Sequence, residues 1–138
     1  MILLQRIFPG ILFLLIINIS ILIPISSTCA AQEFTFVDAE DLTGYYVDKE
    51  TIKIESSEFI IATIAVIRAD MNKMYVYNLR INHKNQMYQI ISSKTFEYDT
   101  RQLIESNDRS RPYRPYAAKS EMSELINYIL YGEDFNNN

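Results

Sequence analysis

The chain has 138 residues, a formal net charge of −4 at pH 7 and a hydrophobic content of 49%. The negative, scattered charge argues against a nucleic-acid-binding protein, which needs a continuous basic surface to neutralise phosphates. The single cysteine excludes a disulfide within the chain. Without a Gly/Ser-rich linker or an internal repeat, this length is typical of one domain with its own hydrophobic core.

The N-terminal residues have the layout of a secretory signal peptide. Met1–Arg6 is short and carries one positive side chain, Ile11–Ile25 is almost wholly apolar, and the residues from there to Ala31 are small. These three parts in this order are typical of a signal peptide. Cleavage after Ala30 or after Ala31 satisfies the preference of signal peptidase for small side chains before the cut. We therefore expect residues 1–30 to be removed on export.

Two other fates of this segment stay open. Ile7–Ile25 is nearly long enough to span a bilayer as an uncleaved anchor, although Asn18 and Ser20 lower its hydrophobicity. Lipidation at Cys29 is the second alternative, but the residues before it lack the leucine and the Gly or Ala that are usual at a lipoprotein cysteine. Cleaved export is the favoured interpretation, and it predicts a protein of the periplasm, the cell surface or the extracellular space.

From Phe34 onwards the pattern is that of β-strands. Phe34–Asp38 and Tyr45–Asp48 are predicted short strands, separated by a polar turn over Ala39–Gly44, and Lys49–Ser56 continues after a bend. Phe59–Ile67 is uncharged and rich in β-branched residues. That composition predicts a central strand covered on both faces.

A hairpin follows a turn at Asp70–Lys73. The strand Met74–Asn82 is joined to Met87–Tyr98 by the turn residues His83–Gln86, and a turn at Asp99 and Thr100 leads to one last short strand. Side chains two residues apart share a face of a strand. The positions expected on one face are Tyr75, Tyr77, Leu79 and Ile81 in the first strand, and Tyr88, Ile90, Phe96 and Tyr98 in the second.

The tripeptide Arg-Pro-Tyr then occurs twice, as Arg111–Tyr113 and Arg114–Tyr116. Each proline fixes its own φ and keeps the preceding arginine out of the helical region, which favours a polyproline II helix with three residues per turn. Arginines, prolines and tyrosines would then form three rows, with the prolines and tyrosines on the domain and the arginines outside. The stretch is either a connector or a binding site. The candidate partner-binding residues are Arg111, Tyr113, Arg114 and Tyr116.

The end of the chain predicts a single amphipathic helix. Its apolar side chains recur at helical spacing, Ser120 is a suitable N-cap, and Gly132 is a suitable end. The apolar positions are Met122, Leu125, Ile126 and Ile129. Residues 133–138 are expected to fray. The sequence therefore predicts one α+β domain over residues 31–138, an antiparallel meander of about five to six strands with a C-terminal helix packed on it.

Three segments carry a family resemblance: YYVDKETIKI (Tyr45–Ile54), LRINHKNQMYQIISSKTFEYDT (Leu79–Thr100) and RPYAAKSEMSELINYIL (Arg114–Leu130). Together they resemble the surface-adhesin protein E family of small exported bacterial proteins. The resemblance implies an antiparallel sheet backed by a helix, a surface or periplasmic location, and, as in some members, binding of host proteins. Many relatives pair a cysteine in the sheet with one at the end of the helix. This chain has neither, so packing alone must hold its helix.

The sequence shows no catalytic or metal-binding motif. His83 is the only histidine and is expected to be an exposed turn residue, and Glu97 and Asp99 have no accompanying residue that points to acid–base chemistry. Asp38–Asp41 and Gly132–Asp134 lack the ligand spacing and central glycine of a calcium loop. We expect no enzyme activity, no metal and no cofactor.

The sequence therefore predicts an exported, adhesin-like protein that recognises a protein partner of the host or the envelope without catalysis. The alternative is a structural or accessory protein of the periplasm or envelope that contacts only bacterial components. No nucleic acid is expected as a partner. A membrane is expected only through the signal segment, if that segment is not cleaved. The oligomeric state stays open.

Overall fold

A computed structural model describes residues 32–132, so the predicted signal peptide and the predicted frayed tail lie outside the described residues. Its strands are β1 (Thr35–Glu40), β2 (Thr43–Ile54), β3 (Phe59–Arg68), β4 (Lys73–Asn82), β5 (Met87–Glu97), β6 (Leu103–Asn107) and β7 (Arg114–Pro115). A short 3-10 helix, η1 (Ala69–Met71), joins β3 to β4, and the α-helix is α2 (Glu121–Tyr131).

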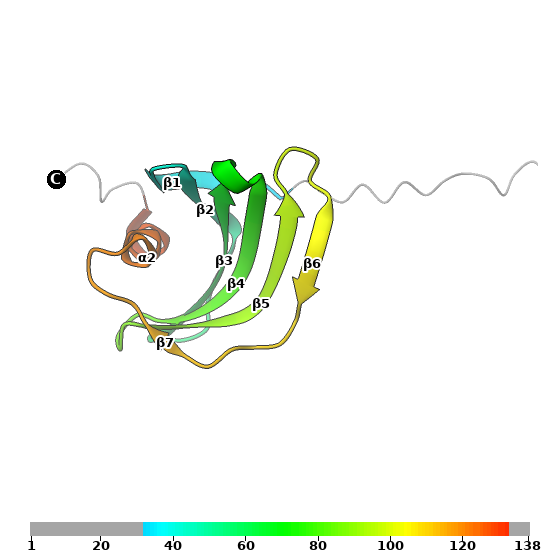
Figure 1. Cartoon of the computed structure of the whole chain (residues 1–138). Helices are drawn as coiled ribbons and strands as arrows, with labels where there is room; N and C mark the ends of the chain where they lie inside the picture. Colours follow the sequence, from blue (N-terminus) through cyan, green and yellow to red (C-terminus); the bar gives the residue numbers. More distant parts are fainter. Residues whose placement is uncertain (1–31, 133–138) are drawn as a thin grey trace, which may run out of the picture. The chain divides into compact units, whose positions relative to one another are not determined.

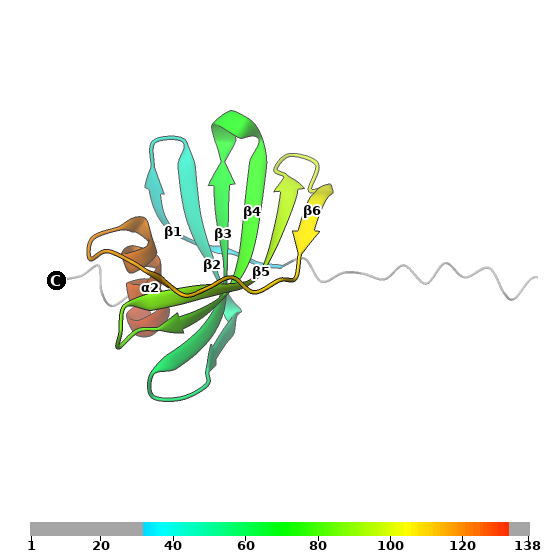
Figure 2. The same cartoon turned by 60° about the horizontal axis from the view of Figure 1, so that its bottom comes forward.

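Strands β1 to β6 form one antiparallel sheet in sequence order, and the short β7 pairs with β5 (Figure 1). The sheet curves around α2, which lies on its inner side (Figures 1 and 2). We call this side of the sheet the helix face and the opposite side the outer face. The predicted α+β class, with a meander and one C-terminal helix, is confirmed.

The main hydrophobic core lies between the helix face and α2. The helix contributes an apolar stripe in which Leu125 is 1% and Ile126 2% exposed. This is the stripe that helical spacing predicts, and its burial removes apolar surface from water. The buried core residues are Val47, Ile60, Ala62, Ile64, Leu79, Ile81, Leu125, Ile126, Tyr128 and Ile129.

A smaller cluster occupies the outer face. Ala65, Met74 and Val76 are buried there because Phe34, Tyr46, Ile67 and Phe96 pack around them. The prediction that β3 is covered on both faces is therefore only partly right. Among the described residues, no helix or second sheet lies on the outer face, and neighbouring side chains provide the cover.

Both ends of α2 form as its sequence predicts. The Ser120 hydroxyl accepts a hydrogen bond from the Ser123 N–H at 3.3 Å and donates one to the Ala117 carbonyl at 2.7 Å. Gly132 has a φ of 66°, and its N–H donates to the Tyr128 carbonyl. Ser120 thus caps an otherwise unpaired backbone donor, and a glycine occupies the left-handed position where other residues are strained.

Two details of the strands differ from expectation. The polar turn predicted over Ala39–Gly44 is only the two residues Asp41 and Leu42, because Ala39 and Glu40 extend β1 and Thr43 begins β2. In β5 the register shifts by one residue, since Asn78 pairs with Ser92 but Leu79 with Ile90.

That shift leaves Ile91 as an extra residue, a β-bulge, and a one-residue insertion exchanges the two faces beyond it. Tyr88 and Ile90 therefore pack on the helix face, while Phe96 belongs to the outer-face cluster. The prediction that Phe96 shares a face with Tyr88 and Ile90 was wrong for this reason.

Two carboxyl groups meet where β1 approaches the start of α2. A hydrogen bond from the protonated Glu40 carboxyl to Glu121, together with the charge of Glu121, raises the pKa of Glu40 above its ordinary value of 4.5. The same contact, with a backbone hydrogen bond, lowers the pKa of Glu121. Glu121 is the first residue of α2, where the helix dipole favours the ionised form. The two carboxyl groups therefore share a proton on Glu40 at acid pH and repel each other once both are ionised.

Glu40→Gln is expected to raise the melting temperature near neutral pH and to leave it unchanged below pH 4.5. The folded state holds the Glu40 proton more tightly than the unfolded chain, so ionisation of Glu40 lowers stability as the pH rises above 4.5. Glutamine removes that ionisation. Melting curves of both proteins across this pH range measure the effect, with Glu50→Gln, an exposed glutamate on β2, as the matched control. A difference that grows towards acid pH would contradict the shared proton.

Candidate functional site

The repeated Arg-Pro-Tyr stretch lies along the edge of β5. Its first residue, Arg111, donates its N–H to the Ile90 carbonyl at 2.8 Å, and its last, Tyr116, donates to the Gln86 carbonyl at 3.1 Å. We call Arg111–Tyr116 the strap. The edge is free because β6 pairs only with the second half of β5, and the strap leads from there into α2 (Figures 1 and 2).

The two prolines suit this edge position. In an antiparallel pair every second residue forms hydrogen bonds to the partner strand. The bond from Tyr116 therefore turns Pro115 away from β5, where a missing N–H costs nothing. If the register of β7 continued, Pro112 would lie opposite Ile90 and would have no N–H for the Ile90 carbonyl. The chain shifts by one residue, so the Arg111 N–H donates to that carbonyl instead.

The two tyrosines of the strap lie on opposite faces of the sheet. The Tyr113 hydroxyl accepts a hydrogen bond from Arg80 Nη1 at 3.3 Å on the outer face. Tyr116 packs against the main core on the helix face, and burial raises the pKa of its hydroxyl. The predicted three-row arrangement is therefore wrong: pairing with β5 gives the strap the two-residue period of a strand, and both prolines are exposed.

Arg80 is the centre of the contacts that hold Tyr113. Its Nε donates to Glu55 Oε2 at 2.6 Å, and its guanidinium lies 4.4 Å from the centre of the Phe59 ring. The hydrogen bond to Glu55 raises the pKa of Arg80. The group joins the strap to the loop after β2 and to the start of β3. Tyr113 is thus a structural residue of the strap.

The arginines of the strap lie beside three tyrosines of the helix face, Tyr75, Tyr77 and Tyr88, which we call the tyrosine patch. Tyr75 and Tyr77 stack with ring centres 6.4 Å apart and planes at 7°. Burial raises the pKa of Tyr77, Tyr75 adds to the rise, and the positive charge of Arg111 opposes it. Arg114 is exposed and pairs with Tyr88.

The patch extends beyond the helix. The nearest strands to α2 are β1 and β2, whereas Tyr75 and Tyr77 belong to β4 and Tyr88 to β5. All three side chains are half-buried, so part of each ring faces solvent. The structure thus brings Arg111 and Arg114 together with the tyrosine patch, whereas Tyr113 lies on the outer face and Tyr116 packs against the main core.

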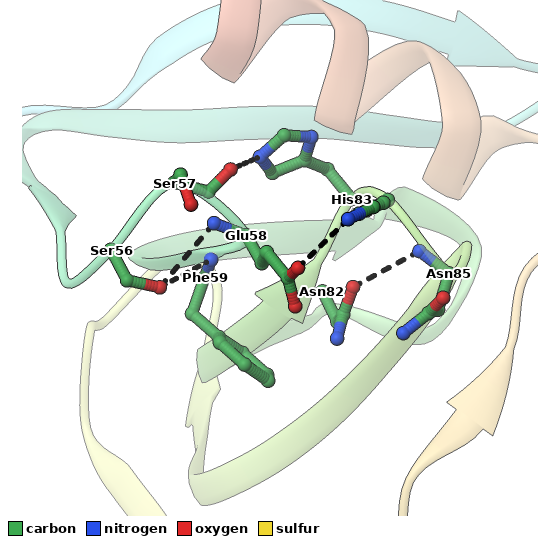
Figure 3. A network of polar contacts seen from close by, with 8 residues as sticks. Ser56, Ser57, Glu58, Phe59, Asn82, His83 and Asn85 are labelled. Carbon is green, nitrogen blue, oxygen red and sulfur yellow. Dashed lines mark hydrogen bonds and ion pairs between the residues drawn. The ribbon is translucent and has the colours of Figure 1, made fainter.

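The only histidine, His83, lies in the turn after β4 and contacts the loop before β3 (Figure 3). The ring nitrogen His83 Nε2 contacts the Ser57 carbonyl oxygen at 3.1 Å. The backbone N–H of His83 donates to the Glu58 carbonyl at 3.2 Å. Lys84 Nζ adds an ion pair with Glu58 Oε1 at 3.0 Å. These contacts tie the loop before β3 to the turn between β4 and β5. His83 is half-buried rather than exposed as predicted, because this loop packs against it.

The two acids singled out in the sequence are turn residues. Glu97 Oε2 accepts a hydrogen bond from the Thr100 hydroxyl at 2.9 Å, and Asp99 Oδ1 accepts one from Asn72 Nδ2 at 3.0 Å. The bond from Asn72 lowers the pKa of Asp99, which therefore stays ionised. Both carboxylates accept bonds that shape the turn between β5 and β6, and the lowered pKa of Asp99 does not suit acid catalysis.

Within residues 32–132, no three His, Cys, Asp or Glu side chains gather closely enough to bind a metal ion. The same part of the chain contains no helix of the length and hydrophobicity needed to cross a membrane. No protein-family model, curated protein or solved structure matches the chain. The contact of Arg80 with Glu55 and Tyr113 was not predicted, because it joins residues 25 and 33 positions apart.

Proposed function

We propose that this chain is an exported, non-catalytic binding protein that recognises a protein partner, in the manner of the surface-adhesin protein E family. The observation that carries the proposal is the position of Arg111 and Arg114 beside the tyrosine patch, on the part of the helix face beyond α2. Tyrosine and arginine dominate the binding energy of many protein interfaces. Tyrosine offers an apolar ring with a polar end, and arginine a planar donor group.

The fold adds support of a weaker kind. An antiparallel sheet with one C-terminal helix is the architecture that the family resemblance implies. Because one fold serves many functions, the proposal rests mainly on the surface. Of the four candidate residues, Arg111 and Arg114 are proposed partner contacts, whereas Tyr113 and Tyr116 hold the strap in place.

Replacing Arg111 and Arg114 together by alanine is expected to weaken binding to an immobilised panel of extracellular-matrix and serum proteins by about tenfold or more. Arg114 is exposed and Arg111 is half-buried, so the melting temperature should stay close to that of the parent protein. Biolayer interferometry with the exported protein measures the affinity. Arg109→Ala is the matched control, since Arg109 is an exposed arginine that precedes the strap. Equal binding by the double variant, or no binding to the panel by the parent protein, would overturn the proposal.

Location separates this function from the envelope-accessory alternative. A host-binding protein must be reachable from outside, so protease added to intact cells should degrade it. Degradation should be as fast as that of a known surface protein in the same cells. Protection that ends only when the cells are broken would favour the alternative function.

A further inference from the structure

Three turns of the meander lie together at one end of the sheet. They join β1 to β2 at Asp41–Leu42, β3 to β4 at Ala69–Asn72, and β5 to β6 at Tyr98–Gln102 (Figure 2). Alternate turns of a meander fall at the same end of the sheet. We call this region the three-turn end. It lies at the opposite end of β5 from the strap, which pairs with Met87 and Tyr88.

Each turn exposes one large apolar side chain. Leu42 is 62% exposed, Met71 47% and Tyr98 36%. Two more exposed side chains, Leu103 and Ile104, follow at the start of β6. Single exposed apolar residues are ordinary on protein surfaces, but a contiguous group of them marks an interaction site.

The turns are joined directly to one another. The Ala69 N–H donates to the Leu42 carbonyl at 3.0 Å, which links the first turn to the second. The Tyr98 N–H donates to the Asn72 carbonyl at 3.0 Å, which links the second turn to the third. The Asn72 side chain adds a donated bond to Asp99 Oδ1 at 3.0 Å and accepts one from the Asp99 N–H at 3.2 Å. The three turns that carry the apolar side chains are therefore held side by side.

The same contacts make the surface rigid. Each turn contains a residue other than glycine in the left-handed region: Asp41 with φ 52°, Asn72 with φ 51° and Arg101 with φ 60°. Such conformations cost energy and persist only where surrounding contacts fix them. A surface that is already ordered loses little conformational entropy when a partner binds.

The charge of this end indicates the chemistry of the partner. Acidic residues accompany Leu42, because Asp38 and Glu40 at the end of β1 and Asp41 in the turn directly precede it. The arginines nearby already have partners. Arg68 pairs with Asp70 at 3.0 Å.

The other arginine of this end, Arg101, lies 4.9 Å from the centre of the Tyr98 ring and donates to Met74 Sδ at 2.7 Å. Phosphate groups of a lipid surface would be repelled by the carboxylates next to Leu42. A lysine or arginine side chain would be attracted to them.

We propose that the three-turn end is a docking surface for a protein segment that carries lysine or arginine beside apolar side chains. Leu42, Met71 and Tyr98 receive the apolar side chains, and Glu40 and Asp41 receive the cations. The proposal is independent of the function assigned to the tyrosine patch, because it concerns other residues at the other end of β5.

Selection of a random peptide library on the immobilised exported protein tests this proposal. The selected peptides are expected to be enriched in Lys or Arg next to apolar residues. Their affinity is expected to fall about tenfold or more when Leu42 and Met71 are both replaced by serine. It should fall with rising salt, and again when Asp41 is replaced by asparagine, which keeps the left-handed turn but removes a charge.

Two controls show whether the effect belongs to this surface. Ile54→Ser changes an apolar residue that is 74% exposed, away from the three-turn end, and should leave peptide affinity unchanged. The Arg111→Ala and Arg114→Ala double variant should also bind the peptides normally, whether or not the tyrosine patch proves to bind a partner.

The proposal is overturned if the library yields no binding peptides, or if the selected peptides lack cationic side chains. It is also overturned if the serine variant binds them as the parent does, or if the protein binds phosphatidylglycerol vesicles through Leu42 and Met71. A melting temperature unchanged by the two serine substitutions would show that any loss of affinity comes from the surface and not from unfolding.

Discussion

Leu125→Ala is expected to lower the free energy of unfolding by about 2–5 kcal/mol, the usual range for a leucine truncated in a packed core. Leu125 is 1% exposed and lies in the middle of the apolar stripe of α2, against the helix face of the sheet. The loss combines the apolar contacts of the missing atoms with the cavity that they leave. Urea denaturation followed by circular dichroism measures it, because α2 is the α-helix of residues 32–132.

The matched control is Leu103→Ala, the same substitution at a side chain that is 52% exposed, where a change within about 0.5 kcal/mol is expected. A loss below about 1 kcal/mol for Leu125→Ala would contradict the packing of α2 against the sheet, since a fully buried leucine contributes more. The single cysteine of the chain cannot form an internal disulfide, so the helix depends on this packing.

The periodicity of the sequence was sufficient to predict the elements that pack on the main core. In β4, Leu79 and Ile81 are buried on the helix face as strict alternation indicates, and in α2 the spacing of Leu125, Ile126 and Ile129 places them all in the core. Both patterns are strong because one face of each element is buried and the other is not. Burial on one face therefore appears in the sequence as a regular spacing of apolar residues.

Register was not predictable in the same way. The bulge at Ile91 has no glycine or proline to mark it, and Ile91 is as suitable for a regular strand as its neighbours. The bulge exists because β4 supplies partners on both sides of it, and β4 is separate from β5 in the sequence. A prediction from β5 alone therefore assigned Phe96 to the wrong face.

The strap shows the same limit for a candidate site. A residue before proline favours extended conformations, and both polyproline II and β geometry satisfy that preference. The strap adopts β geometry because the Gln86 and Ile90 carbonyls at the free edge of β5 accept its hydrogen bonds. Once the strap pairs there, Tyr113 and Tyr116 lie on opposite faces and cannot contact one partner together.

The Thr51 hydroxyl bridges the bulge in β2. Asp48 pairs with Thr63 and Lys53 with Ile61, so the residues between Asp48 and Lys53 on β2 stand opposite one residue of β3. In this gap the Thr51 hydroxyl donates to the Asp48 carbonyl at 2.8 Å and accepts from the Thr63 N–H at 2.8 Å. It thus replaces backbone bonds that a regular ladder would provide, and Asp48 Oδ1 accepts a further bond from the Glu50 N–H at 3.1 Å.

Thr51→Val is expected to lower the free energy of unfolding by about 1–3 kcal/mol, because valine keeps the shape of threonine but leaves a backbone donor and a backbone acceptor without partners. The Thr63 amide should also exchange its hydrogen faster, while amides between β3 and β4 keep their rates. Urea denaturation and amide hydrogen exchange measure the two effects.

Thr51→Ser is the control, since it keeps the hydroxyl and loses one methyl group, for an expected change of about 0.8 kcal/mol or less. The Thr63 amide should then exchange at its original rate. If valine and serine instead gave the same stability and the same exchange rate, the bulge would be held by the flanking pairs Asp48–Thr63 and Lys53–Ile61. The hydroxyl would then only fill a gap that water can occupy equally well, because water satisfies the same donor and acceptor.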